Sequence, residues 1–177
     1  MKPEELLKRQ HAILHVLSGL PKKILYSHTI DRLPELVLHE IACEDCFNLN
    51  KVAFLVDNPD FDCLKGVAGV SREEAFPRGS SIWEDPNQFS IHMNSSTFNE
   101  KVRNHLQISC KKHAKPDDEV FSNIAQTLGM QKYNVCSWNM KHDNHGYLLY
   151  EKMDYDDTAP DDYIVHGASL LGFCPLH

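Results

Sequence analysis

The sequence predicts an α/β or α+β protein: a single mixed sheet with a βαβ unit near residues 23–56, a C-terminal hairpin and about four helices. Three observations support this fold class. Apolar residues recur at helical spacing near the N-terminus, short apolar runs of strand type follow helical segments, and two such runs near the C-terminus flank a polar turn. At 177 residues the chain is expected to form a single globular domain, 1–177.

The N-terminal segment, residues 3–18, is expected to be a helix. Pro3 suits the first position of a helix, and the apolar side chains that follow recur on one helical face. Gly19 and Pro21 are expected to end this helix, because glycine is frequent just beyond helix ends and proline cannot donate a backbone hydrogen bond.

The predicted βαβ unit follows. Residues 23–27 form a short apolar run of strand type, residues 32–48 are expected to be a helix capped by Asp31, and residues 52–56 are the clearest buried strand. A strand, a helix and a strand within about 35 residues match the size of a parallel, right-handed βαβ unit.

The rest of the chain is expected to complete the sheet and its helices. Residues 71–96 are expected to be mostly loop. The expected strands are 66–70, 89–93, 133–139, 146–152 and the strand-like segment 164–173, and the expected helices are 97–109 and 116–129. Residues 140–145 join two of these strands as a polar hairpin turn, whose Asp, Asn and His side chains are interpreted as turn residues in solvent.

Composition narrows the classes of function. The formal net charge is −7, which argues against nucleic-acid binding because such proteins usually carry a basic excess. Neither a signal peptide nor an apolar run long enough to cross a bilayer is found, so a soluble, cytoplasmic protein without a membrane partner is expected. The six cysteines are then expected to be reduced thiols.

One cluster of residues predicts a metal site. On the expected helix 32–48, the side chains of His39, Cys43 and Cys46 would fall within a narrow arc opposite Ile41. Imidazole and thiolate groups are ligands of zinc and iron, so a cytosolic zinc- or iron-binding protein, and with an open coordination position a metal-dependent enzyme, is the first hypothesis. The candidates for a fourth ligand are His28, Cys63, Cys110, His113, Cys174 and His177.

A second hypothesis explains the same cysteines without metal. A single C-x2-C pair is not a zinc finger, and free cysteines are among the most frequently buried residues. The protein would then be a non-catalytic protein-interaction domain whose cysteines pack in the core. Its acidic loop, residues 154–162, would meet a basic partner.

The third hypothesis is a metal-independent hydrolase or transferase. If the βαβ unit forms, the carboxyl ends of its strands bring His28, Asp57 and Asp60 to the same edge of the sheet, where open α/β sheets bind ligands. These three residues are therefore the candidate catalytic groups. No phosphate-binding loop, dinucleotide fingerprint or serine-hydrolase elbow is found in the sequence.

Overall fold

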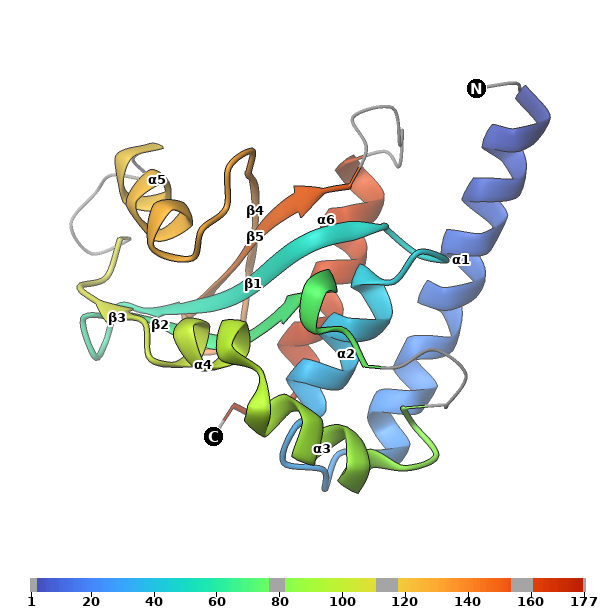
Figure 1. Cartoon of the computed structure of the whole chain (residues 1–177). Helices are drawn as coiled ribbons and strands as arrows, with labels where there is room; N and C mark the ends of the chain where they lie inside the picture. Colours follow the sequence, from blue (N-terminus) through green and yellow to red (C-terminus); the bar gives the residue numbers. More distant parts are fainter. Residues whose placement is uncertain (1–2, 77–81, 111–117, 154–160, 177) are drawn as a thin grey trace.

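The computed structural model describes residues 3–76, 82–110, 118–153 and 161–176, and it has the α+β architecture (Figure 1). Its strands form one five-stranded sheet in the order β3-β2-β1-β5-β4, with every neighbouring pair antiparallel. The strands are β1 (Leu49–Asn58), β2 (Cys63–Ser71), β3 (Leu106–Gln107), β4 (Asn134–Asn139) and β5 (His145–Lys152).

The described residues form six α-helices, somewhat more than the four expected. The helices are α1 (Pro3–Tyr26), α2 (Leu33–Ala42), α3 (Pro86–Ser95), α4 (Thr97–Arg103), α5 (Asp118–Thr127) and α6 (Asp161–Ser169). Two short 3-10 helices, η1 (Arg72–Glu74) and η2 (Leu170–Phe173), follow β2 and α6.

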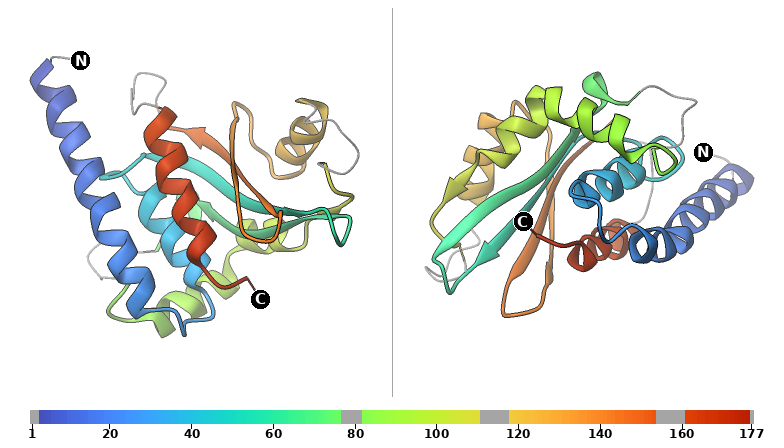
Figure 2. Two further views of the ribbon diagram at one scale, coloured as in Figure 1. Left: turned by 180° about the vertical axis from the view of Figure 1, so that it is seen from behind. Right: turned by 90° about the horizontal axis from the view of Figure 1, so that it is seen from below.

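Helices cover both faces of the sheet (Figure 2). Helices α1, α2 and α6 pack on one face, where Phe54 and Leu148 join the larger hydrophobic core. Helices α4 and α5 pack on the opposite face, where Leu55 and Leu149 join a second core. Neighbouring strand residues thus contribute to different cores, because successive side chains of a strand point to opposite faces.

Helix α1 continues past the residues that were expected to end it. It runs through Gly19 and Pro21 to Tyr26, because Leu20 and Ile24 are buried on the same helical face as Ile13. The free energy gained by burying these side chains outweighs the weak local preference of glycine and proline against helix. Although α1 spans 24 residues, no helix among the described ranges is apolar and long enough to cross a membrane.

The predicted βαβ unit is wrong. Residues 23–26, expected to begin a strand, form the last turn of α1. Strand β1 therefore has no parallel neighbour, and it pairs with β2 and β5 in antiparallel fashion. The apolar run at 23–27 was ambiguous because a short apolar segment fits a buried strand and a buried helical turn equally well.

Two further segments expected as strands are helical. Residues 89–93 lie in α3, which Pro86 and an Asp85 cap begin; the Asp85 side chain accepts a hydrogen bond from the Gln88 amide. Residues 164–173 lie in α6 and η2, where Ile164, Ala168 and Leu171 are fully buried at spacings of four and three residues. That spacing is typical of a helical face.

The two hairpins follow from local sequence. Strands β4 and β5 pair through a turn in which His142 and Asp143 have positive φ angles, which confirms the C-terminal hairpin. Strands β1 and β2 pair through a turn in which Asp62 also has a positive φ. Asp and His adopt this left-handed conformation more readily than most other residues, so the turns suit their sequence.

Helix α4 sits directly on β2 because two glycines remove the side chains that would separate them. A Cβ atom at Gly66 would lie 1.7 Å from the Val102 carbonyl oxygen, and one at Gly69 would lie 2.5 Å from a Val102 methyl group. The Asn99 side chain strengthens the contact by accepting a hydrogen bond from the Gly69 amide at 2.9 Å. This close approach fixes the position of the C-terminal end of α4.

We expect Gly66→Ala to lower the free energy of unfolding by about 1–3 kcal/mol, since the obstructing atoms belong to the backbone. Gly19→Ala is the matched control: a Cβ atom there meets no atom within 4 Å, and the residue lies inside α1. It should raise the free energy by about 0.5–1 kcal/mol. Urea unfolding followed by circular dichroism measures both. Equal stability of Gly66→Ala and the wild type would contradict this packing.

Candidate functional site

The predicted metal ligands do not share a helical face. Helix α2 ends at Ala42, and Cys43 has extended backbone angles (φ −62°, ψ 165°), so the helix expected over 32–48 is too long. Beyond this point the chain turns, and Cys46 is fully buried in the larger core. Only His39 and Cys43 line a common hollow. Within the described residues, no group of three His, Cys, Asp or Glu side chains is arranged to hold a metal ion.

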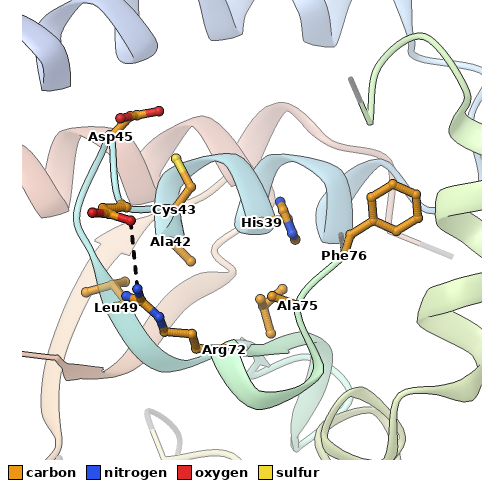
Figure 3. A pocket seen from close by; sticks show the side chains of 10 residues that line it. His39, Ala42, Cys43, Asp45, Leu49, Arg72, Ala75 and Phe76 are labelled. Atoms are coloured by element: carbon orange, nitrogen blue, oxygen red, sulfur yellow. Dashed lines mark ion pairs between the residues drawn. The ribbon is translucent and has the colours of Figure 1, made fainter. Parts of the chain in front are cut away.

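The hollow beside His39, which we call the His39 hollow, has a volume of about 690 Å³ (Figure 3). It lies between the end of α2, the start of β1 and the η1 turn. The Cys43 sulfur does not point toward the His39 ring (Figure 3). The residues that line the His39 hollow are His39, Ala42, Cys43, Glu44, Asp45, Leu49, Val70, Arg72, Ala75 and Phe76.

Arg72, the cation of the His39 hollow, already has partners within the protein. It donates a hydrogen bond to the Asn48 side chain at 2.7 Å and pairs with Glu44 at 3.8 Å. A ligand at Arg72 would therefore have to compete with these contacts, although both side chains of the ion pair are partly exposed to solvent. This weakens the His39 hollow as a ligand site.

The electrostatics of this hollow do not favour thiol catalysis. Burial lowers the pKa of His39, although the neighbouring Glu40 opposes that shift and His92 adds to it. Burial also raises the pKa of Cys43. Near neutral pH the pair is therefore a neutral imidazole and a protonated thiol, whereas cysteine nucleophiles and metal ligands act as thiolates.

Three of the six cysteines are buried in the hydrophobic cores. Cys46 and Cys174 lie in the larger core and Cys110 in the second core. Burial raises the pKa of all three thiols, in the case of Cys174 to about 12, with the nearby Glu35 carboxylate adding to the shift. Neutral, buried thiols behave as small apolar side chains.

The three predicted catalytic residues lie in different parts of the fold. His28 is exposed just beyond α1, and its Nδ1 atom is 2.9 Å from the Leu25 carbonyl oxygen. Asp57 is fully buried in β1, and Asp60 is exposed in the turn that follows this strand. With no βαβ unit, the argument that brought His28 to the edge of the sheet beside the two aspartates fails.

The acidic loop 154–162 lies largely outside the described residues. Of this segment only Asp161 and Asp162 are described, and they begin α6. A basic partner at this loop stays a prediction.

A second hollow, of about 550 Å³, lies where α2, β2, α4 and the β4–β5 turn meet, and we call it the Glu35 pocket. It takes in residues far apart in sequence. Its lining residues are Asp31, Pro34, Glu35, Val56, Asn58, Cys63, Lys65, Gly66, Val67, Arg103, Asn104, Asn144, Pro175 and Leu176.

Glu35 is the most unusual residue of this pocket, because its side chain is only 1% exposed. Its Oε1 atom accepts hydrogen bonds from Arg32 at 2.8 Å and from Arg103 at 2.7 Å. Its Oε2 atom is buried and has no hydrogen-bond partner in the described part of the chain. A buried charge is expected to be fully paired, so a buried carboxylate oxygen without a hydrogen-bond partner is unusual in proteins.

Asn144 supplies a second open acceptor. Its side-chain oxygen Oδ1 is buried without a hydrogen-bond partner among the residues described, and the residue lines the same pocket. Its backbone is fully used: the amide donates to the Lys141 carbonyl and the Asn144 carbonyl accepts from the Met140 amide. The turn therefore holds Asn144 in place without help from its side chain.

The Glu35 pocket was missed from the sequence, although one signal pointed to it. Glu35 is the sole charged residue in the apolar run from Leu33 to Leu38. Its partner Arg103 lies 68 residues away, and Asn144 lies farther still along the chain. No local pattern links them.

Comparisons of this chain with protein-family models, with curated proteins and with solved structures found no match.

We expect thiol labelling to separate packing cysteines from accessible ones. In the native protein, iodoacetamide should label the partly exposed Cys63 and Cys136, while Cys46, Cys110 and Cys174 should react only after unfolding. Peptide mass spectrometry measures each site, with and without a metal chelator. Rapid native labelling of the three buried thiols would contradict the packing role. Chelator-dependent labelling of Cys43 and Cys46 would instead support the metal site.

Proposed function

We propose that this protein is a non-catalytic binding domain that holds a small molecule in the Glu35 pocket. The observation that carries this proposal is the buried Glu35 carboxylate at the wall of this pocket, one oxygen of which is held by two arginines while the other has no hydrogen-bond partner in the described residues. The ligand donates hydrogen bonds to Glu35 Oε2 and to Asn144 Oδ1.

The energetics of buried polar groups support this proposal. A buried acceptor without a partner destabilises a fold by about 1–3 kcal/mol, and more when the group is charged. Two residues with such acceptors, Glu35 and Asn144, line one pocket. Each acceptor atom is itself buried, so a ligand reaches it only when side chains at the pocket wall move aside. A ligand that donates hydrogen bonds to both acceptors recovers part of this free energy on binding. The site therefore favours compounds that carry hydrogen-bond donors over apolar compounds.

The volume of the pocket is also suitable. Small-molecule sites occupy about 300–1,000 Å³ and combine apolar walls with a few convergent polar groups. Here Val56, Val67 and Leu176 contribute apolar surface beside the polar atoms of Glu35 and Asn144.

A binding role is favoured over catalysis by the groups present. Catalysis by a nucleophile requires a hydroxyl or thiol within hydrogen-bond reach of a base. The thiol of Cys63 lines the pocket, yet no hydrogen bond joins it to a histidine or carboxylate in the described residues. The carboxylate of Glu35 instead serves to fix Arg32 and Arg103 and to accept from a ligand.

We expect Asn144→Ala to weaken ligand binding about five- to tenfold, which corresponds to one lost hydrogen bond of about 1 kcal/mol. The melting temperature of the ligand-free protein should stay the same or rise, because the substitution removes an unpaired buried acceptor. Thermal-shift and calorimetric titrations with a panel of small amines, amides, polyols and hydroxy acids measure both quantities.

The control is Arg72→Ala, which alters the His39 hollow and should leave binding unchanged. At a ligand concentration ten times Kd, binding should add about 1.4 kcal/mol of stability, or about 3–6 °C. The proposal fails if no compound of the panel stabilises the wild type, or if the stabilisation depends on Arg72 and not on Asn144.

A further inference from the structure

The charges around the Glu35 pocket restrict its ligand further. Two cations, Lys65 and Arg103, line it together with the carboxylates of Asp31 and Glu35, and Arg32, outside the lining, also pairs with Glu35. Because Glu35 is already held by two arginines, Lys65 and the remaining N–H groups of Arg103 are the cationic groups left for a ligand. These groups favour a ligand with an anionic group.

Two of the cations have hydrogen-bonding capacity left for a ligand. Arg103 uses its Nη1 atom for Glu35, and its side chain is 41% exposed, so other N–H groups of its guanidinium face solvent. Lys65 is exposed, lines the pocket and forms no salt bridge within the described ranges. Lys65 comes from β2 and Arg103 from α4, so the two cations approach the cavity from different elements.

The two buried acceptors, Glu35 Oε2 and Asn144 Oδ1, require a hydrogen-bond donor on the ligand. A carboxylate ligand placed against Glu35 Oε2 would be repelled unless a donor lies between the two groups. A simple amine would satisfy that oxygen but would leave its own positive charge among three protein cations. The site is matched by a molecule that carries an anion and a hydrogen-bond donor on adjacent atoms.

Resting on the proposed function, we propose that the ligand of the Glu35 pocket is a 2-amino or 2-hydroxy carboxylic acid with an apolar side chain. Its carboxylate binds Lys65 and Arg103, and its amino or hydroxyl group donates to Glu35 and Asn144. The apolar side chain packs on the wall formed by Val56, Val67 and Leu176.

A series of compounds on one carbon skeleton tests this inference. L-Leucine and 2-hydroxyisocaproate carry both groups, isocaproate lacks the donor, and isoamylamine lacks the carboxylate. By calorimetric titration we expect at least one of the first two to bind about tenfold or more tightly than both of the others, since each removed group costs a charge-assisted hydrogen bond. Whether L-leucine or 2-hydroxyisocaproate binds more tightly shows whether the donor of the ligand is an amino or a hydroxyl group.

Variants assign the two ends of the ligand. Lys65→Ala should weaken binding of the tighter acid about tenfold and leave isoamylamine unaffected, because only the acid has a group for the lysine. Lys101→Ala is the matched control, since Lys101 is an equally charged, exposed residue of α4 that does not line the pocket. Asn144→Ala should weaken the acid and isoamylamine alike. Glu35→Gln does not separate a loss of binding from a loss of folding, because breaking a buried ion pair can unfold the protein.

Alkylation of cysteine thiols shows where on the protein the acid binds. Cys63 lines the pocket and Cys136 lies on β4 outside it, and both thiols are partly exposed. Saturating acid should slow alkylation of Cys63 without changing that of Cys136. Protection of neither thiol, with binding detected by calorimetry, would place the acid elsewhere and overturn the inference.

The outcomes separate this inference from the proposed function. Binding of isocaproate or isoamylamine as tightly as the two acids overturns the inference. So does binding, at the Glu35 pocket, of donor-bearing compounds other than these acids while neither acid binds; the proposed function then stands. Failure of every compound tested, in this series and in the broader panel, overturns both.

Discussion

A carboxylate held between two arginines joins the two sides of this molecule. Glu35 belongs to α2, which packs on one face of the sheet, and Arg103 belongs to α4, which packs on the other. The 2.7 Å contact between them passes around the β2 side of the sheet. The close seating of α4 on Gly66 and Gly69 places Arg103 within reach, so the packing of one helix sets the geometry of the pocket.

The buried Glu35 carboxylate lowers the stability of the fold, which suggests that it has a functional role. Replacing a buried ion pair by apolar side chains is often neutral or stabilising, so stability alone gives little reason to keep one. Here a single oxygen accepts from both arginines while the second is buried without a hydrogen-bond partner in the described residues. Local rules of consistency are most often broken at functional sites, and the Glu35 carboxylate is one such break in the described residues. The His39 hollow, whose Arg72 is paired internally, shows no such break.

Sequence reasoning succeeded where the determinants are local. The hairpin of β4 and β5 and the buried strand β1 follow from short apolar runs and turn residues. It failed at residues 23–27 and 164–173, where apolar runs became helical because tertiary packing buries one face of each. The metal hypothesis depended on a helix continuing past Ala42. The Glu35 pocket depends on Arg103 and Asn144, which only the three-dimensional fold brings to Glu35.

The most direct test is the mapping of amide chemical shifts in ¹⁵N-labelled protein titrated with L-leucine and, separately, with 2-hydroxyisocaproate. The account predicts saturable shifts at Val67, Asn144 and Leu176 around the Glu35 pocket for at least one of these acids. Arg72 and Ala75, in the His39 hollow, should stay unchanged. Shifts confined to the His39 hollow, or no shifts with either acid, would contradict it.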